Sequence, residues 1–159
     1  AASGQVSVTD LAKAFTADLG PGCPAGISDR LRKLEFLPVR GFMRGFVDLI
    51  FEHEGRWYVV DWKSNKLGTE HTHYAPDQLS DAMLKSAYVL QYHLYLLALH
   101  RYLKWRLGDV YDYDTHIGGA YYLFTRGMSP RWGPGYGIFR DRPTKALIER
   151  LDALMRGKA

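Results

Sequence analysis

The chain of 159 residues carries a formal net charge of +4, and 47% of its residues are hydrophobic, which predicts one domain with a sizeable buried core. Because Cys23 is the single cysteine, the composition excludes a disulfide framework and a cysteine-bound iron–sulfur cluster within the chain, and a reducing cytoplasm is the expected location. No run of about 18 apolar residues occurs, so no membrane span is expected. The net positive charge suits a polyanionic partner.

The first predicted element is a short helix from Val8 to Leu19, with Thr9 or Asp10 as its N-terminal cap. A loop rich in Gly and Pro, from Gly20 to Gly26, ends this helix. From there to Ser64 we expect extended strands to dominate.

A β-hairpin is predicted around Glu54 and Gly55, because this pair lies between runs rich in aromatic and β-branched residues and glycine supplies the positive φ of a two-residue turn. A turn of two residues fixes the register of both strands. The predicted cross-strand pairs are Asp48 with Asp61, Ile50 with Val59, and Phe46 with Lys63.

Alternation places Asp48, Asp61 and Lys63 on one face of this hairpin. Two carboxylates directly opposite each other, with Cβ atoms roughly 4.5–5.5 Å apart, repel, so a cation is expected between them. The other face is predicted to be the core face, and it carries Val47, Leu49, Phe51, Tyr58, Val60 and Trp62.

These polar residues are the types that metal-dependent phosphodiester hydrolysis requires. Carboxylates hold a divalent cation beside the scissile phosphate, and a lysine lies near the attacking water. Oxygen ligands suit Mg²⁺ or Mn²⁺. The alternative is an ordinary cross-strand ion pair between Asp48 and Lys63 that leaves Asp61 in water, and the spacing Asp-x-Lys alone is short enough to recur by chance.

A loop from Asn65 to Pro76 follows, and His71 and His73 within it are interpreted as solvated residues rather than metal ligands. A long helix is then predicted from Ala75 to Leu107. One of its faces has the periodicity of a core stripe, in which Gln91 is the exception because a buried amide needs partners from an active site or a DNA backbone. The stripe consists of Leu84, Tyr88, Gln91, Tyr95, Ala98 and Tyr102.

The C-terminal third is predicted to contain a strand from Gly119 to Thr125, an irregular loop from Gly127 to Tyr136 and an amphipathic helix from Thr144 to Met155. A strand, a helix and a further strand in this order imply a mixed sheet with a crossover. No Gly-x-x-x-x-Gly-Lys-Ser/Thr loop occurs, so the chain has no predicted ATP site.

The hairpin segment from Val39 to Gly68 closely resembles the C-terminal nuclease domain of bacterial RecB, the β subunit of exonuclease V. Three further segments, 90–103, 111–114 and 118–127, resemble successive parts of the same domain in the same order. The resemblance implies an α/β fold of the restriction-endonuclease-like PD-(D/E)xK class, in which helices flank a mixed central sheet. Residues 1–159 are then expected to form a single domain that is truncated at its N-terminus.

The resemblance also implies roles for particular residues. Asp48 and Asp61 would be ligands of Mg²⁺, for which Mn²⁺ substitutes, together with the backbone carbonyl of Trp62. Lys63 would orient or activate the attacking water, and Gln91 and Tyr95 match the Gln-x-x-x-Tyr element of these nucleases. The implied partners are single- and double-stranded DNA ends and subunits similar to RecC and RecD, in double-strand break repair and degradation of linear DNA.

One feature departs from this family, whose members carry a metal-binding histidine well upstream of the first catalytic aspartate. The first histidine here is His53, beyond Asp48. A module that binds DNA or sister subunits without cutting is therefore the competing expectation. Arg44 and Lys66, which lie near the predicted metal site, are the basic residues expected to contact DNA phosphates.

Overall fold

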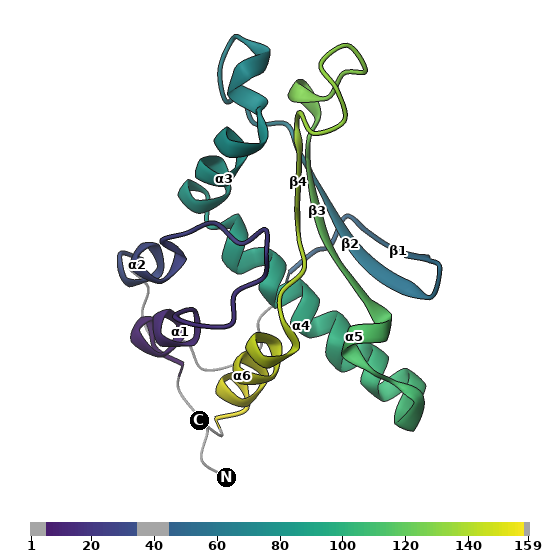
Figure 1. Ribbon diagram of the computed structural model, residues 1–159. Helices are drawn as coiled ribbons and strands as arrows, with labels where there is room; N and C mark the ends of the chain where they lie inside the picture. Colours follow the sequence, from purple (N-terminus) through teal and green to yellow (C-terminus); the bar gives the residue numbers. More distant parts are fainter. Residues whose placement is uncertain (1–5, 35–44, 158–159) are drawn as a thin grey trace.

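A four-stranded mixed sheet forms the centre of the computed structural model, which describes residues 6–34 and 45–157. Strand β1 (Leu49–His53) runs antiparallel to β2 (Arg56–Lys63), β2 runs parallel to β3 (Ile117–Phe124), and β3 runs antiparallel to β4 (Ile138–Asp141). The spatial order β1-β2-β3-β4 therefore contains one parallel pair, joined by a helical crossover (Figure 1). This arrangement confirms the predicted α/β class with its mixed sheet.

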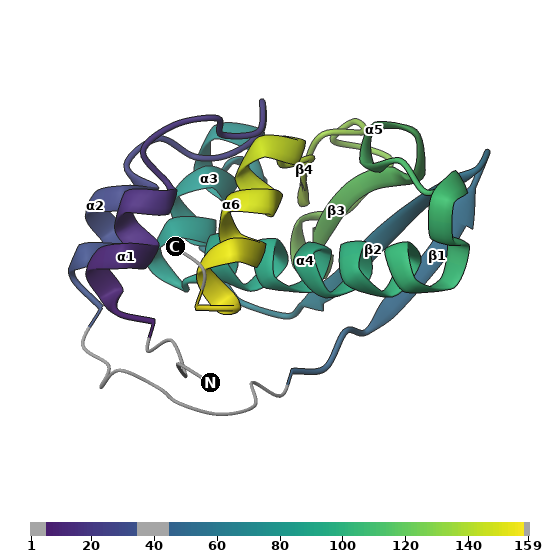
Figure 2. The same ribbon diagram turned by 90° about the horizontal axis from the view of Figure 1, so that it is seen from below.

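Helices gather on one side of this sheet, and α4 runs across that side in contact with β2 and β3 (Figure 2). No helix in the described part of the chain is long and apolar enough to cross a membrane. The α-helices are α1 (Val8–Ala14), α2 (Ile27–Arg32), α3 (Pro76–Lys85), α4 (Tyr88–Leu107), α5 (Tyr113–His116) and α6 (Lys145–Met155), and the short 3₁₀ helices are η1 (His71–Tyr74), η2 (Gly108–Val110) and η3 (Thr125–Gly127).

The hairpin turn at Glu54 and Gly55 forms as predicted, with positive φ values of 51° and 78° that match a tight two-residue turn. Its register is also confirmed where the strands pair, since Ile50 lies opposite Val59. The ladder ends at Leu49, so the predicted pairing of Phe46 with Lys63 does not form.

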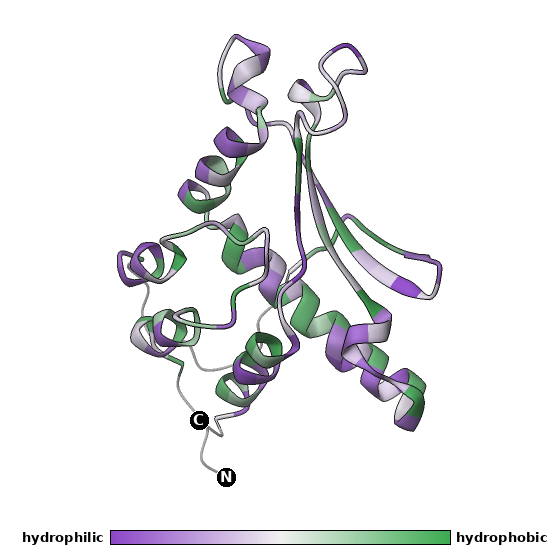
Figure 3. Cartoon of the chain, in the orientation of Figure 1, coloured by the Kyte–Doolittle hydropathy of each residue, from purple (hydrophilic) through white to green (hydrophobic). Residues whose placement is uncertain are grey.

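The predicted core face of the hairpin is only partly buried, since Val60 is 4% exposed but other members of that face are exposed. The helix-covered face carries Val59 and Asp61, which are fully or almost fully buried, whereas Leu49 and Trp62 on the opposite face are 40% and 46% exposed. The other face was predicted to carry the site, and α4 covers it at Val59 and Asp61, while Asp48 and Ile50 on the same face stay exposed. Figure 3 shows hydrophilic residues at the hairpin tip and apolar residues further along its strands.

The N-terminal segment is more helical and less extended than predicted. Helix α1 ends at Ala14, and its cap is Ser7, whose hydroxyl accepts a hydrogen bond from the backbone NH of Asp10 at 3.1 Å. A second helix, α2, occupies part of the region that was expected to form strands. Its buried Ile27 and Leu31 pack into the core, and this tertiary contact outweighs the weak local helical signal.

The predicted long helix is two helices, because the chain changes direction at Ala87. Ala87 has a φ of 56°, in the left-handed region, which ends α3 before α4 begins. The buried face of α4 also differs from the predicted stripe, since Ala98 and Tyr102 are exposed. The buried residues of α4 are Val89, Tyr92, His93, Leu96, Leu97, Leu99, His100 and Leu103.

The C-terminal elements agree more closely with the sequence. Strand β3 begins two residues earlier than expected, and α6 forms behind Thr144, whose hydroxyl accepts a hydrogen bond from the backbone NH of Leu147. Two short elements, α5 and β4, were not predicted, because neither is long enough to show a hydrophobic period.

We predict that Ala87→Gly stabilises the fold by up to about 1 kcal/mol. Glycine relieves the strain of an alanine Cβ in the left-handed region, which costs roughly 1–2 kcal/mol. Part of this gain is lost because glycine has more conformational entropy in the unfolded chain. Urea unfolding measures the change. The control is Ala98→Gly at an exposed site within α4, where about 1 kcal/mol should be lost. Destabilisation by both substitutions would contradict the left-handed conformation of Ala87.

Candidate active site beneath helix α4

A buried ion pair lies at the C-terminal end of β2. The side chains of Asp61 and Lys63 project from the same face of the strand, and the Lys63 Nζ lies 2.5 Å from the Asp61 Oδ1. Asp61 is 4% exposed, so this carboxylate is almost wholly removed from water. The Lys63 ammonium also lies over the ring of Tyr88, 4.0 Å from its centroid. Burial and aromatic contact leave this lysine little freedom.

Helix α4 completes the surroundings of the lysine through Gln91. The Gln91 Oε1 accepts hydrogen bonds from the Lys63 Nζ at 3.3 Å and from the Tyr122 hydroxyl at 2.8 Å. The Gln91 Nε2 donates to the Tyr95 hydroxyl at 3.0 Å. The amide predicted to need partners in an apolar stripe therefore has three, and each bond fixes which way the amide faces.

Tyr95 continues this chain of hydrogen bonds to the segment that carries Asp48. Its hydroxyl donates to the backbone carbonyl of Phe46 at 2.6 Å. Asp48, two residues later, accepts a hydrogen bond through its Oδ2 from the backbone NH of Trp62 at 2.9 Å. The two contacts hold the segment before β1 against α4 and β2.

The two aspartates interact through their charges. Burial raises the pKa of the Asp61 carboxyl above its ordinary value, Lys63 opposes this shift, and the nearby charge of Asp48 raises the pKa further. The repulsion expected between the two carboxylates is therefore present, although they do not form a ladder pair. Asp48 is exposed and Asp61 is buried, so the pair spans the boundary between solvent and the interior.

The remaining predicted residues lie at different distances from this centre. Trp62 occupies β2 between Asp61 and Lys63, and Arg44 falls outside the described residues. Lys66 is exposed and lines a pocket behind the end of β2 with His71, Arg126 and Trp132. His71 stacks on Trp132 and is itself exposed, which agrees with its interpretation as a solvated residue.

Sequence reasoning missed the contribution of Tyr122 and understated that of Tyr88. Tyr122 lies on β3 directly beside Asp61, and its hydroxyl bonds to Gln91. Tyr88 lies beneath the Lys63 ammonium, and its hydroxyl donates to the Asn65 side chain at 3.2 Å. The parallel register of β2 and β3 brings Tyr122 to this place, and a single sequence gives no signal for that register.

Comparison with known proteins assigns the chain to a family. The sequence model of the PD-(D/E)XK nuclease superfamily matches residues 17–154, which include β1, β2 and α4. The chain belongs to the PD-(D/E)XK nuclease superfamily. In this PD-(D/E)XK domain, the end of β2 carries Asp61 and Lys63 in the Asp-x-Lys spacing.

Proteins named RecBCD enzyme subunit RecB are close relatives. The Escherichia coli protein is 46% identical over 87% of this chain, and that of Haemophilus influenzae is 46% identical over 76%. The Mycobacterium tuberculosis protein (strain H37Rv) is 39% identical over 98% of the chain. The chain spans 11%, 10% and 15% of the lengths of these three relatives.

We predict that Asp48→Asn lowers the pKa of the Asp61 carboxyl, because it removes the nearby negative charge while the amide oxygen still accepts from Trp62. NMR titration of the Asp61 side-chain carboxyl carbon measures this pKa directly. Glu52→Gln at the exposed end of the hairpin is the matched control and should leave it unchanged. An Asp61 pKa that stays constant or rises in Asp48→Asn would show that the two carboxylates are not coupled.

Proposed function

We propose that this domain hydrolyses DNA phosphodiester bonds in a reaction that depends on a divalent metal. The observation that carries the proposal is the convergence of Asp48 and Asp61 beside Lys63, beneath a helix that fixes the lysine through Gln91. Membership of the nuclease superfamily supports the reaction class.

The donor atoms of this site fit Mg²⁺. Asp48 and Asp61 offer carboxylate oxygens, and Mg²⁺ typically binds one or two protein carboxylates while it keeps several waters. We propose that these carboxylates and the Trp62 backbone carbonyl hold the ion, with Mn²⁺ as a substitute. When bound, the ion would polarise the scissile phosphate and lower the pKa of a coordinated water.

Lys63 is proposed to orient the attacking water with its ammonium group. In the described structure this ammonium is tied to the Asp61 carboxylate and the Gln91 amide, and it lies against the Tyr88 ring. Gln91 and Tyr95 act as positioning residues, since their hydrogen bonds connect Lys63 on β2 to the segment before β1. A lysine held in this way loses less conformational freedom when the transition state forms.

DNA is proposed to approach along the open end of β2. Lys66 is exposed there and shares a pocket with Arg126, whose Nε donates to the Ser64 carbonyl at 2.8 Å. Two cations just beyond Lys63 suit the phosphates that flank a scissile bond. Arg44 is proposed as a further phosphate contact.

The biological setting is proposed from the relatives named RecBCD enzyme subunit RecB. We propose that the domain acts within an exonuclease V enzyme with RecC- and RecD-like subunits in the cytoplasm. There it would degrade linear DNA and process double-strand ends for recombination. ATP binding and unwinding would belong to other parts of that enzyme, since this chain has no Gly-x-x-x-x-Gly-Lys-Ser/Thr loop.

We predict that Asp61→Asn and Lys63→Ala each lower Mg²⁺-dependent DNA cleavage by the complete enzyme roughly 100-fold or more, because they remove a metal ligand and the cation near the water. Unwinding should persist, and the two activities are measured on the same end-labelled duplex. Asp109→Asn and Lys104→Ala, at exposed sites, are the matched controls. Undiminished cleavage by Asp61→Asn would refute the assignment of the metal site.

We predict that Gln91→Leu lowers kcat about 10- to 100-fold with little change in KM for DNA, because Lys63 and Tyr122 lose their shared acceptor while the DNA-binding surface stays intact. Single-turnover cleavage separates the two parameters. Gln78→Leu at an exposed position of α3 is the control. If Gln91→Leu changed KM alone, the residue would contact DNA rather than position the lysine.

A further inference from the structure

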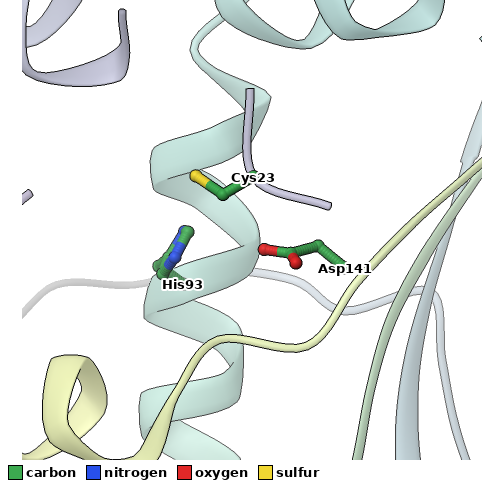
Figure 4. A group of neighbouring side chains, drawn as sticks. All are labelled: Cys23, His93 and Asp141. Atoms are coloured by element: carbon green, nitrogen blue, oxygen red, sulfur yellow. The ribbon is translucent and has the colours of Figure 1, made fainter. Parts of the chain in front are cut away.

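A second group of metal-binding side chains lies apart from the proposed nuclease centre. Cys23 from the loop between α1 and α2, His93 from α4 and Asp141 from the end of β4 come together over α4 (Figure 4). One donor atom from each lies within 4.8 Å of the other two. His93 and Asp141 are 0% and 2% exposed, and Cys23 is half-buried.

His93 has an unused nitrogen in the interior. Its Nδ1 lies 2.7 Å from the backbone carbonyl of Val89, an acceptor that requires the proton to be on Nδ1. The Nε2 then carries a lone pair, and it is the one buried side-chain nitrogen or oxygen without a hydrogen-bond partner in the described part of the chain. Histidine ligands of metals show this pattern, with one nitrogen bonded to a carbonyl and the other free to coordinate.

Asp141 is a buried carboxylate that accepts hydrogen bonds from neutral donors. Its Oδ2 accepts from the Tyr92 hydroxyl at 2.7 Å and its Oδ1 accepts from the backbone NH of Gly22 at 2.8 Å. None of the ion pairs in residues 6–34 and 45–157 includes it. Buried carboxylates are normally paired with a cation or bound to a metal, so a cation beside Asp141 would offset its burial.

The loop that carries Cys23 is shaped for close approach to β4. A Cβ on Gly22 would lie 2.2 Å from the Arg140 carbonyl, and a Cβ on Gly20 would lie 2.5 Å from the Asp141 carboxylate. Only glycine at both positions lets the loop backbone come this near to β4. The loop therefore brings Cys23 close to Asp141 and His93.

The cluster is separate from the nuclease centre, although both lie on the same face of the sheet. Asp61 on β2 pairs with Tyr122 on β3, which pairs with Phe139 on β4, so Asp141 lies two strands and two residues away, about 10 Å or more. Helix α4 serves both sites, since Gln91 contacts Lys63 whereas Tyr92 contacts Asp141.

We propose that Cys23, His93 and Asp141 bind a transition-metal ion of the Zn²⁺ class. A thiolate and an imidazole favour Zn²⁺ over Mg²⁺, and three protein ligands with a water in the fourth position complete a tetrahedron. Donor atoms around Zn²⁺ stand roughly 3.3–3.6 Å apart. The three donors here lie within 4.8 Å of one another, so the side chains would move closer together around a bound ion. The bound ion fastens the N-terminal loop to α4 and β4.

Cobalt spectroscopy tests this site without relying on nuclease activity. After chelator treatment, Co²⁺ is added to the chain, and a sulfur-to-cobalt charge-transfer band is expected at one equivalent. Because the chain contains one cysteine, this band reports Cys23 alone. Zn²⁺ should abolish the band and raise the melting temperature by several degrees, whereas excess Mg²⁺ should do neither.

Variants separate this site from the nuclease centre. Cys23→Ser should lose the band, His93→Gln should weaken Co²⁺ binding at least about 100-fold, and Asp61→Asn should keep both. Where a variant fails to fold, protection of the parent Cys23 from iodoacetamide by micromolar Zn²⁺ gives the same answer. Absence of the band and of protection in the parent chain, or an unchanged Co²⁺ affinity in His93→Gln, would overturn the proposal.

Discussion

Carboxylates buried beneath α4 are the constraint around which this domain is organised. A buried charge costs several kcal/mol unless partners replace its lost hydration. Asp61 is balanced by Lys63, which must then be held by Gln91 and Tyr88. Asp141, on the same face, relies instead on the Tyr92 hydroxyl and a backbone NH. The polar groups on this face therefore determine which residues α4 presents to the sheet.

Helix α4 meets these two demands with neighbouring residues. Successive side chains of a helix project about 100° apart, so Gln91 reaches β2 while Tyr92 and His93 turn toward β4 and the N-terminal loop. Tyr122 stands between the two centres and bonds to Gln91. The separation keeps a hard, oxygen-based site on β2 apart from a group that contains sulfur and imidazole. Both sites nevertheless depend on one rigid element.

In the hairpin, local chemistry determines the strand register and tertiary packing determines which face is buried. The turn at Glu54 and Gly55 sets the register through its own backbone geometry, and the register is local information. Which face of the hairpin is buried is not local. The sequence placed the core on the face of Leu49 and Trp62, yet α4 packs on the face of Val59 and Asp61, where its Gln91 bonds to Lys63. Apolar Leu49 and Trp62 remain exposed in consequence.

The sequence by itself determined the fold class and the hairpin with its turn, because turn chemistry, spacing and family resemblance are encoded within short segments. It also named the candidate site residues, which are Asp48, Asp61, Lys63, Gln91 and Tyr95. It did not determine the break at Ala87, the helix α2 or strand β4, whose local signals are weak. Only the tertiary structure brought Tyr122 beside Asp61 and assembled Cys23, His93 and Asp141 from three distant segments. The physical reason is that a parallel crossover and a loop packed against a strand create contacts between residues far apart in the chain, and no periodicity records such contacts.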